Sequence, residues 1–358
     1  MFAVNMPLLP EQASTLAVHV DRLFWFIMLV TVAAGVGVYA VMAFFCVKYR
    51  RSAVEGPTPR IMGSHQLELF WSVSPLIIFL FIFVWGAWVY NFAIHAPPDA
   101  DEIYVVGKQW MWKAQYPNGQ RVIIGANTEG ITSIDRKYVG ALVLPVNKPV
   151  RLILTSEDVI HDFAVPAFRS KVDVLPGRYV STWYHPTKVG EYHLFCDQYC
   201  GTEHSKMVGK VIVMEEEDYQ EWLTGTSDGK GAKNPVDGSP AWEGRQLFQK
   251  LQCLACHSAN AEARAPVLEG LYKSRVPLHG GGSVIADDTY IRESILHPMK
   301  KVVEGWNPTI MPAYKDQVTE EDIINLIAYI RSLKAGDTPK RTDSYPAPVG
   351  ASTGSKGD

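Results

Sequence analysis

The 358-residue chain has little net charge, few cysteines and a modest share of charged residues. Its formal net charge is −3 and charged residues make up 20% of it, so it lacks the general basic field that nucleic-acid binding requires. Five cysteines are too few and too clustered for a disulfide-stabilised scaffold. The 47% of hydrophobic residues excludes a disordered or collagen-like chain, and the length favours several domains over one core.

Two long stretches contain no charged side chain. They cover residues 23–47 and 69–94, and each exceeds the roughly 20 residues that cross a hydrocarbon core as a helix. The loop between them is basic, with Lys48, Arg50, Arg51 and Arg60, and basic loops face the cytoplasm. The sequence therefore predicts a two-span transmembrane hairpin within residues 1–97, followed by an extracytoplasmic chain. A pair of buried core helices in a soluble protein is the alternative, which the basic loop disfavours.

Residues 98–214 carry short apolar stretches separated by turn residues. No helix-length periodic segment interrupts them, which predicts an antiparallel β-sandwich or barrel. The expected strands lie at residues 103–106, 121–124, 141–144, 150–154, 179–184, 191–195 and 209–213.

The segment that follows residue 195 concentrates soft metal ligands. Cys200, His204 and Met207, with His161 upstream, would make a mononuclear blue-copper site. Cys196 is an additional thiol, and two thiolates four residues apart on a turn can bridge two copper ions. A structural disulfide and a zinc site are the alternatives. A disulfide leaves the two histidines and Met207 without a shared role, and thioether ligands favour copper over zinc.

These features together resemble subunit II of the haem–copper cytochrome c oxidases. The resemblance covers about residues 10–214 and includes Trp110-Met-Trp112 and the segment from Ser156 to His161. It implies a cupredoxin-like domain that holds the dinuclear copper centre CuA, and it implies that electrons from cytochrome c are received at Trp110. The implied copper ligands are His161, Cys196, the backbone carbonyl of Gln198, Cys200, His204 and Met207.

Other positions of this resemblance bear on protons, magnesium and docking. Glu68, at the inner end of the second span, matches the start of a proton path into subunit I, although an interfacial carboxylate facing water is the alternative. The family usually has Glu where this chain has Gln198, and a neutral amide is a poorer magnesium ligand, which leaves that magnesium site open. Glu157, Asp158 and Asp173 resemble the acidic patch that docks soluble cytochrome c. We hypothesise that they receive the C-terminal domain instead.

A second motif follows a change of composition. Residues 215–240 are acidic and then rich in Gly, Ser, Lys and Asn, which predicts a linker. Beyond it, Cys253-Leu-Ala-Cys256-His257 is the C-x-x-C-H signature of c-type haem attachment. A redox C-x-x-C or half of a zinc site are the alternatives. Met311, followed by Pro312, supplies a candidate sixth iron ligand, and Met299 is its rival.

Residues 241–334 resemble the class I cytochromes c. The resemblance implies an all-α domain with one covalent haem c, held by Cys253 and Cys256 through thioethers and by His257 and Met311 at the iron; Pro266 matches the residue near the proximal histidine. Thr319 is expected to cap a helix over residues 320–334 with an apolar face of Ile323, Ile327, Ile330 and Leu333. Residues 335–358 are expected to form a disordered tail.

The whole chain resembles subunit II of a caa-type oxidase, in which a cytochrome c domain follows the CuA domain. The resemblance implies that electrons pass from an external donor, a soluble cytochrome c or another respiratory complex, through the haem c and CuA to subunit I. That subunit reduces oxygen to water with proton translocation. The expected setting is a bacterial plasma membrane, with other membrane subunits and lipid as further partners and no nucleic acid.

Three other functions are alternatives to this one. A CuA-bearing subunit of a nitric oxide reductase would share the copper ligands, and a stand-alone membrane-anchored electron carrier would share both motifs. A quinol oxidase subunit is disfavoured because its homologues lack the copper ligands found here. The two apolar runs contain no set of histidines for an oxygen-reducing centre, so this chain is expected to act only within a complex.

Overall fold

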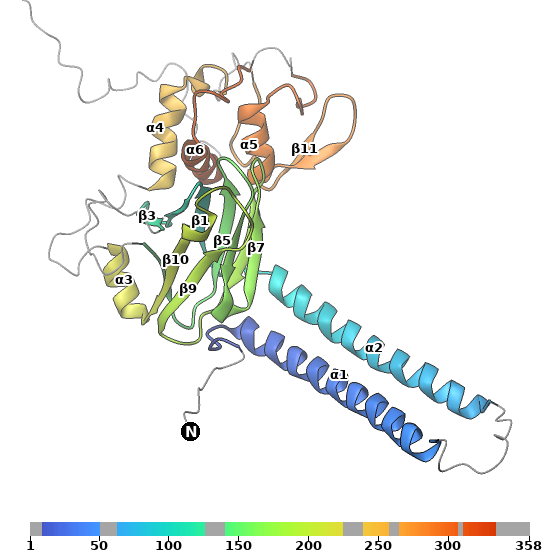
Figure 1. Ribbon diagram of the computed structural model, residues 1–358. Helices are drawn as coiled ribbons and strands as arrows, with labels where there is room; N and C mark the ends of the chain where they lie inside the picture. The colour runs from blue at the N-terminus through green and yellow to red at the C-terminus, as the bar shows by residue number, and fades with distance from the viewer. Residues whose placement is uncertain are drawn as a thin grey trace, which may run out of the picture.

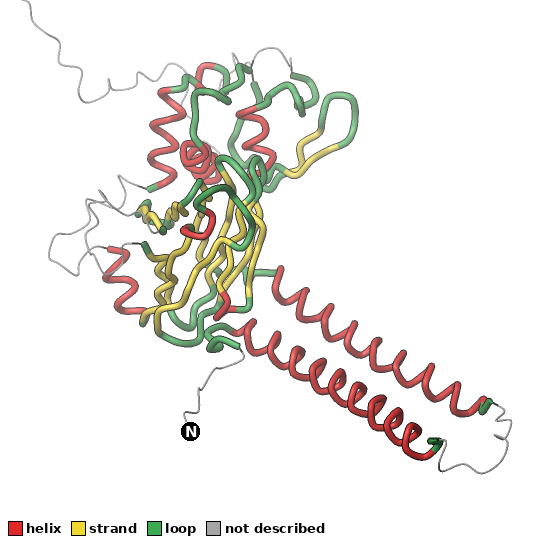
Figure 2. The backbone as a smooth tube through the Cα atoms, viewed as in Figure 1, coloured by secondary structure: helices red, strands yellow, loops and turns green. Residues whose placement is uncertain are grey.

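The computed structural model describes residues 9–50, 63–125, 140–224, 239–257, 265–306 and 311–333. A helical hairpin projects from one end of a β-sandwich, and a smaller helical unit covers the opposite end (Figures 1 and 2). Most of the expected linker, residues 225–238, and the expected tail, residues 335–358, lie outside the described residues.

The hairpin consists of α1 (Thr15–Lys48) and α2 (His65–Ile94), which run side by side. Their large apolar side chains face outward, as Phe44, Phe70 and Phe83 do with 56%, 68% and 70% exposure. An apolar surface of this length is typical of a segment that is covered by lipid or by another membrane protein. Both helices are long and apolar enough to cross a membrane, so the hairpin fits a membrane anchor.

Buried polar contacts join the hairpin to the β-sandwich. The Arg169 guanidinium donates to both carboxylate oxygens of Asp21 on α1, at 2.7 and 2.8 Å, and this bidentate geometry is among the strongest side-chain contacts. The Trp183 indole N–H donates to the carbonyl of Phe92 on α2 at 3.1 Å. The sandwich is therefore attached near the N-terminal end of α1 and the C-terminal end of α2.

The sandwich is built from two five-stranded sheets. Their facing sides form one core that includes Trp112, Phe163 and Phe168, none of which is exposed to solvent. In spatial order, the first sheet contains β3 (Arg121–Ile124), β2 (Met111–Gln115), β1 (Asp101–Lys108), β5 (Val150–Ser156) and β8 (Val180–Tyr184). The second contains β4 (Ala141–Pro145), β10 (Val208–Met214), β9 (Gly190–Cys196), β6 (His161–Val165) and β7 (Ser170–Val174).

The predicted sandwich is confirmed, but its sheets are mixed instead of purely antiparallel. β1 pairs with β5 in parallel, and β10 pairs with β4 in parallel; the other pairs are antiparallel. The sequence pattern identifies a strand and its buried face, but it does not encode the direction of the neighbour in the sheet. This is why the parallel pairs were not expected.

A short helix, α3 (Glu216–Thr224), occupies the beginning of the expected linker. Its Tyr219 and Trp222 join the buried core of the sandwich, so the β domain extends beyond residue 214. Three acidic side chains in its first turn interact favourably with the positive end of the helix dipole. Those same acidic residues gave the segment its linker-like composition.

The C-terminal unit contains α4 (Pro240–Lys250), the 3-10 turn η7 (Cys253–Ala255), α5 (Asp288–Leu296) and α6 (Glu320–Ser332). It is helical apart from a short hairpin of β11 (Arg275–Pro277) and β12 (Ser283–Ile285). Thr319 caps α6 as predicted, in a reciprocal capping box with Asp322. The predicted apolar face is also confirmed, because Ile323, Ile327, Ile330 and Leu333 lie in the core of this unit.

Helices α4 and α6 cross at Gly244. A Cβ atom at this position would lie 1.9 Å from the backbone oxygen of Asn325, so only glycine allows the two backbones to approach this closely.

We predict that Gly244→Ala destabilises the C-terminal unit. Overpacking of this kind costs about 1–3 kcal/mol, and here the clash involves backbone atoms that cannot rotate away. Thermal unfolding of the full chain, followed by circular dichroism, should show a lower midpoint for the transition of this unit. Gln246→Ala, on the exposed side of the same helix, is the control; equal midpoints for the two variants would contradict the prediction.

Candidate functional sites

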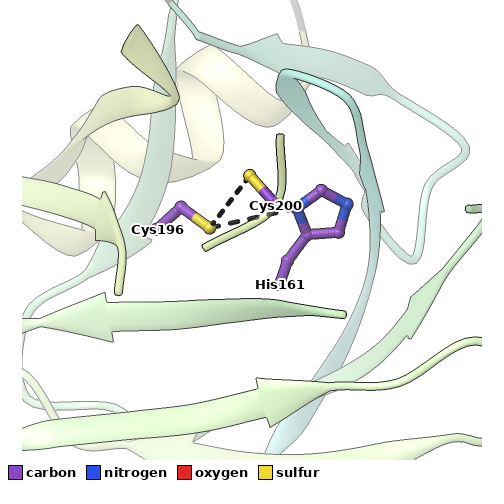
Figure 3. Close-up of side chains that lie close together, drawn as sticks. All are labelled: His161, Cys196 and Cys200. Carbon is purple, nitrogen blue, oxygen red and sulfur yellow. Dashed lines mark hydrogen bonds between the residues drawn. The ribbon is translucent and has the colours of Figure 1, made fainter. Parts of the chain in front are cut away.

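The first candidate site lies where β6 begins and β9 ends. His161 is the first residue of β6 and Cys196 the last of β9. The loop from β9 to β10 carries Cys200, the 3-10 turn η4 (His204–Lys206) and Met207. The Cys196 amide donates to the Met207 carbonyl at 3.1 Å, which closes the loop. Figure 3 shows Cys196, Cys200 and His161 pointing toward one another.

All of the predicted copper-ligand positions converge on the two sulfur atoms. The Sγ atoms of Cys196 and Cys200 are 3.7 Å apart. His161 Nδ1 lies 3.9 Å from the first sulfur, and His204 Nδ1 lies 3.5 Å from the second. Met207 Sδ is 3.8 Å from Cys200 Sγ, and the Gln198 carbonyl oxygen is 3.3 Å from Cys196 Sγ. One imidazole thus flanks each sulfur, so the pair of sulfur atoms has a histidine at both ends.

The cysteine pair is not a disulfide, because both thiols are free and their separation far exceeds the bonded distance of about 2.05 Å. Burial raises the pKa of Cys196, but hydrogen bonds with the His161 ring and with the backbone of Asp162 and Gln198 together outweigh burial and lower that pKa to about 7. Burial and the charge of Cys196 raise the pKa of Cys200 to about 12. Two thiolates therefore need bound cations, and thiolate, thioether and imidazole ligands together fit copper.

Asp158 fixes the orientation of His161. Its Oδ1 accepts the Nε2 proton of His161 at 2.9 Å, and its Oδ2 accepts the Gln109 amide at 2.8 Å. Burial alone would raise the pKa of Asp158, but these hydrogen bonds lower it, so the carboxylate stays charged. The bond to Nε2 leaves Nδ1 as the lone-pair nitrogen toward the sulfurs. The family resemblance assigns Asp158 to a docking patch. Its position three residues before His161 is the sequence feature that could have indicated its contact with the histidine.

Gly107 and Trp112 pack against the His161 ring. A Cβ atom at Gly107 would lie 3.0 Å from His161 Cδ2 and 3.0 Å from the Trp112 ring, so β1 approaches the imidazole as closely as a backbone can. The Trp112 and His161 ring centroids are 5.6 Å apart. Nothing in the sequence pattern distinguished Gly107 from other strand glycines.

Trp110 and Glu68 lie at different ends of the molecule. Trp110 follows the end of β1 and contacts the copper-ligand loop, since a Cβ at Gly201 would be 3.3 Å from its indole ring. Gln109 donates to the Cys200 carbonyl at 2.7 Å beside it. Glu68 is in the first turn of α2 with its side chain 54% exposed, 4.0 Å from His65. The roles implied for both residues remain predictions.

The second candidate site is a cavity in the C-terminal unit. Its empty space, about 1250 Å³ in total, includes space open to solvent. Cys253, Cys256, His257 and Met311 all line it. Met299 is not among the lining residues and is 57% exposed, which favours Met311 as the sulfur ligand.

The proximal side of this cavity suits an iron ligand. His257 Nδ1 donates to the Pro266 carbonyl at 2.7 Å, which leaves Nε2 as the free lone-pair nitrogen. Burial lowers the pKa of His257, so the ring is neutral, as metal ligation requires. The predicted position of Pro266 beside this histidine agrees with the structure, and these residues fit a haem.

Family models match three consecutive parts of the chain. Residues 3–87 match "Cytochrome C oxidase subunit II, transmembrane domain", residues 102–216 match "Cytochrome C oxidase subunit II, periplasmic domain", and residues 241–334 match "Cytochrome c". A probable cytochrome c oxidase subunit 2 of Rickettsia bellii is 30% identical over 218 residues, which cover 59% of this chain and 80% of the relative.

The chain belongs to the cytochrome c oxidase subunit II family.

The chain is also similar to two further proteins. The cytochrome c oxidase subunit 2 of Alkalihalophilus pseudofirmus is 29% identical over 316 residues, covering 86% of this chain and 85% of that one. The crystal structure of the periplasmic domain of subunit II of cytochrome oxidase from Bradyrhizobium japonicum is 34% identical. It covers 38% of this chain and all of that one, with a TM-score of 0.33. As a subunit II with a C-terminal cytochrome c domain, the chain is part of an oxidoreductase complex, and the two families imply copper and haem.

We predict that Asp158→Asn weakens metal binding at the sulfur cluster. The variant keeps the shape of the side chain but loses the charge that orients His161, and changes of this kind cost about 10–100-fold in metal affinity. Competition with a copper chelator measures the effect. Glu157→Gln is the matched control, because that neighbouring carboxylate pairs with Lys108 and Lys113 instead of a histidine. Equal affinities for the two variants would refute the assignment.

Proposed function

We propose that this chain is subunit II of a caa-type cytochrome c oxidase in a bacterial plasma membrane. It receives electrons from an external donor, either a soluble cytochrome c or another respiratory complex. It passes them through one covalent haem c and a dinuclear copper centre to subunit I, which reduces oxygen to water with proton translocation. Bound haem and copper supply the one-electron chemistry, and the chain supplies their ligands, their burial and their attachment to the membrane.

One observation carries this proposal: two separate sets of ligand-type side chains come together in a single membrane-anchored chain. The sulfur cluster lies in the β-sandwich, and C-x-x-C-H lines a cavity in the next domain. The alignment with the Alkalihalophilus relative covers more of the chain than residues 1–240 could supply, which favours a shared two-domain arrangement. Subunit II of a haem–copper oxidase works with subunit I, and the apolar hairpin offers the surface for that contact.

The proposed copper ligands are His161, Cys196, the Gln198 carbonyl, Cys200, His204 and Met207. In this proposal both thiols would hold the metal pair, together with the imidazoles that lie beside them. A main-chain oxygen serves at residue 198, so the Gln side chain there does not affect the copper site. The proposed haem ligands are Cys253, Cys256, His257 and Met311.

We expect electron paramagnetic resonance of the oxidised complex to show copper hyperfine structure shared over two nuclei. Because the proposed site depends on both thiols, Cys200→Ser should remove this signal. His193→Ala should retain it, since His193 is an exposed residue of the same strand as Cys196 and is not a proposed ligand. A one-nucleus pattern in the unchanged protein would contradict a dinuclear centre, and a lack of bound copper would contradict the proposed function.

We also expect one haem to remain attached to the denatured chain. Replacing both Cys253 and Cys256 by Ala should abolish haem staining of the denatured band, whereas Cys46→Ala, at an exposed position of α1, should not change it. Met311→Leu should lower the haem reduction potential, because a thioether ligand raises it, while Met299→Leu should leave it unchanged. Staining that survives loss of both cysteines would refute covalent attachment.

A further inference from the structure

Two faces of helix α6 contact different parts of the molecule. Leu326 and Ile330 line the cavity of the C-terminal unit. On the other side of the helix, Ile324 is 1% exposed and packs against Tyr104, Val106 and Ile153 on the outer face of the β-sandwich. A single helix therefore separates the proposed haem cavity from the sheet of β1 and β5, and Figure 1 shows α6 seated over these two strands. The copper-ligand strands β6 and β9 belong to the other sheet, which faces this one across the core of the sandwich.

Polar contacts surround Ile324 and hold the two domains in this orientation. Arg331 donates to the Tyr104 hydroxyl at 2.6 Å and to Glu102 at 2.5 Å. The buried Asn325 accepts from Gln115 at 2.8 Å. Lys113 bridges Glu157 of the β domain and Glu321 of α6, at 3.0 and 2.8 Å. Glu157 is thus linked to α6 indirectly, through Lys113.

Strand β1 leads from this contact to the copper site. Val106 points outward to Ile324, whereas the next residue, Gly107, points inward to the imidazole of His161, because successive strand residues face opposite sides of a sheet. One peptide unit therefore joins Val106, in the interdomain contact, to Gly107, which packs against the ring of a proposed copper ligand. Trp110 lies farther along the chain, beyond the end of β1, and packs on Gly201.

We infer that the cytochrome domain passes its electron to the copper site through the contact of α6 with β1, with Ile324 and Val106 as the bridging pair, and not through Trp110. This inference rests on the proposed function. One electron leaves the cytochrome domain, which is oxidised, and enters the copper domain, which is reduced; no bond changes and no proton moves. Trp110 then remains the point of contact for a different donor.

The test follows electron transfer between the two domains in the purified complex after photoreduction of the cytochrome domain, using the absorption of each centre. Ile324→Ala, which removes the bridging atoms, should slow this transfer severalfold, and Ile324→Leu should restore most of the rate. Gln246→Ala, at an exposed position of α4, is the control and should leave the rate unchanged. A rate that responds to Trp110→Phe but not to Ile324→Ala would overturn the inference.

A second measurement reports docking without either cofactor. A carbodiimide should cross-link Lys113 to Glu321 by an amide bond, and the Lys113–Glu157 link within the β domain is the internal control. The Ile324 variants should retain both links by mass spectrometry, so that slowed transfer reflects the bridge and not loss of docking. Arg331→Glu should weaken the interdomain link, and the pair Arg331→Glu with Glu102→Arg should recover it.

The cross-linked protein also separates the two routes. Transfer at the unmodified rate in the linked complex supports the α6–β1 route, with the similarly treated Glu321→Gln variant as the matched control for carbodiimide chemistry. Transfer that stops only when the 113–321 link forms would mean that the domain must turn toward Trp110, which overturns the inference. Spectra of each sample show whether haem and copper are bound, so a failure of the proposed function is distinguished from a failure of the route.

Discussion

Two thiolates at the separation of Cys196 and Cys200 repel each other in a buried site. The surrounding residues supply the groups that could bind cations and so remove this repulsion. Without a cation, His161 favours the charged form of Cys196, while the proton stays on Cys200. Metal cations at both ends would remove the conflict, and an imidazole already stands at each end. The β-sandwich brings these ligands together. It places one imidazole at the start of β6 and one thiol at the end of β9, and the short loop after β9 carries the other ligands.

The need to hold the ligands in place also explains the residues that contact them. Asp158 holds the His161 ring by one nitrogen so that the other faces the sulfurs, and Gly107 leaves room for the ring against β1. Such supporting contacts keep a metal site in one geometry. Because Gly107 has no side chain, β1 can lie against the His161 ring. The preceding residue of the same strand, Val106, lies in the interdomain contact.

The sequence allowed the local features to be predicted but not the long-range ones. The loop from Cys196 to Met207 carries its ligands at short spacing, so their convergence followed from the chain itself, and Thr319 and the apolar face of α6 followed from helix periodicity. The parallel pairs β1–β5 and β4–β10 did not, because side-chain alternation is the same for either direction. The interdomain contacts were also missed: Lys113, Glu321 and Arg331 have the composition of a solvated surface, and their partners lie in another domain.

The interdomain contact combines a specific orientation with modest strength. Its ion pairs, with Lys113 and Arg331 each 25% exposed, are of a kind that contributes about 0.2–1 kcal/mol each and weakens with salt. The buried Ile324 and the hydrogen-bonded Asn325 select one register, because a shift along α6 would leave polar groups of Asn325 and Gln115 unpaired. A covalent tether supplies the local concentration that a free carrier would need from affinity. In the proposed function, the fused carrier therefore relies on a weak but well-oriented contact, which the Ile324 face of α6 provides.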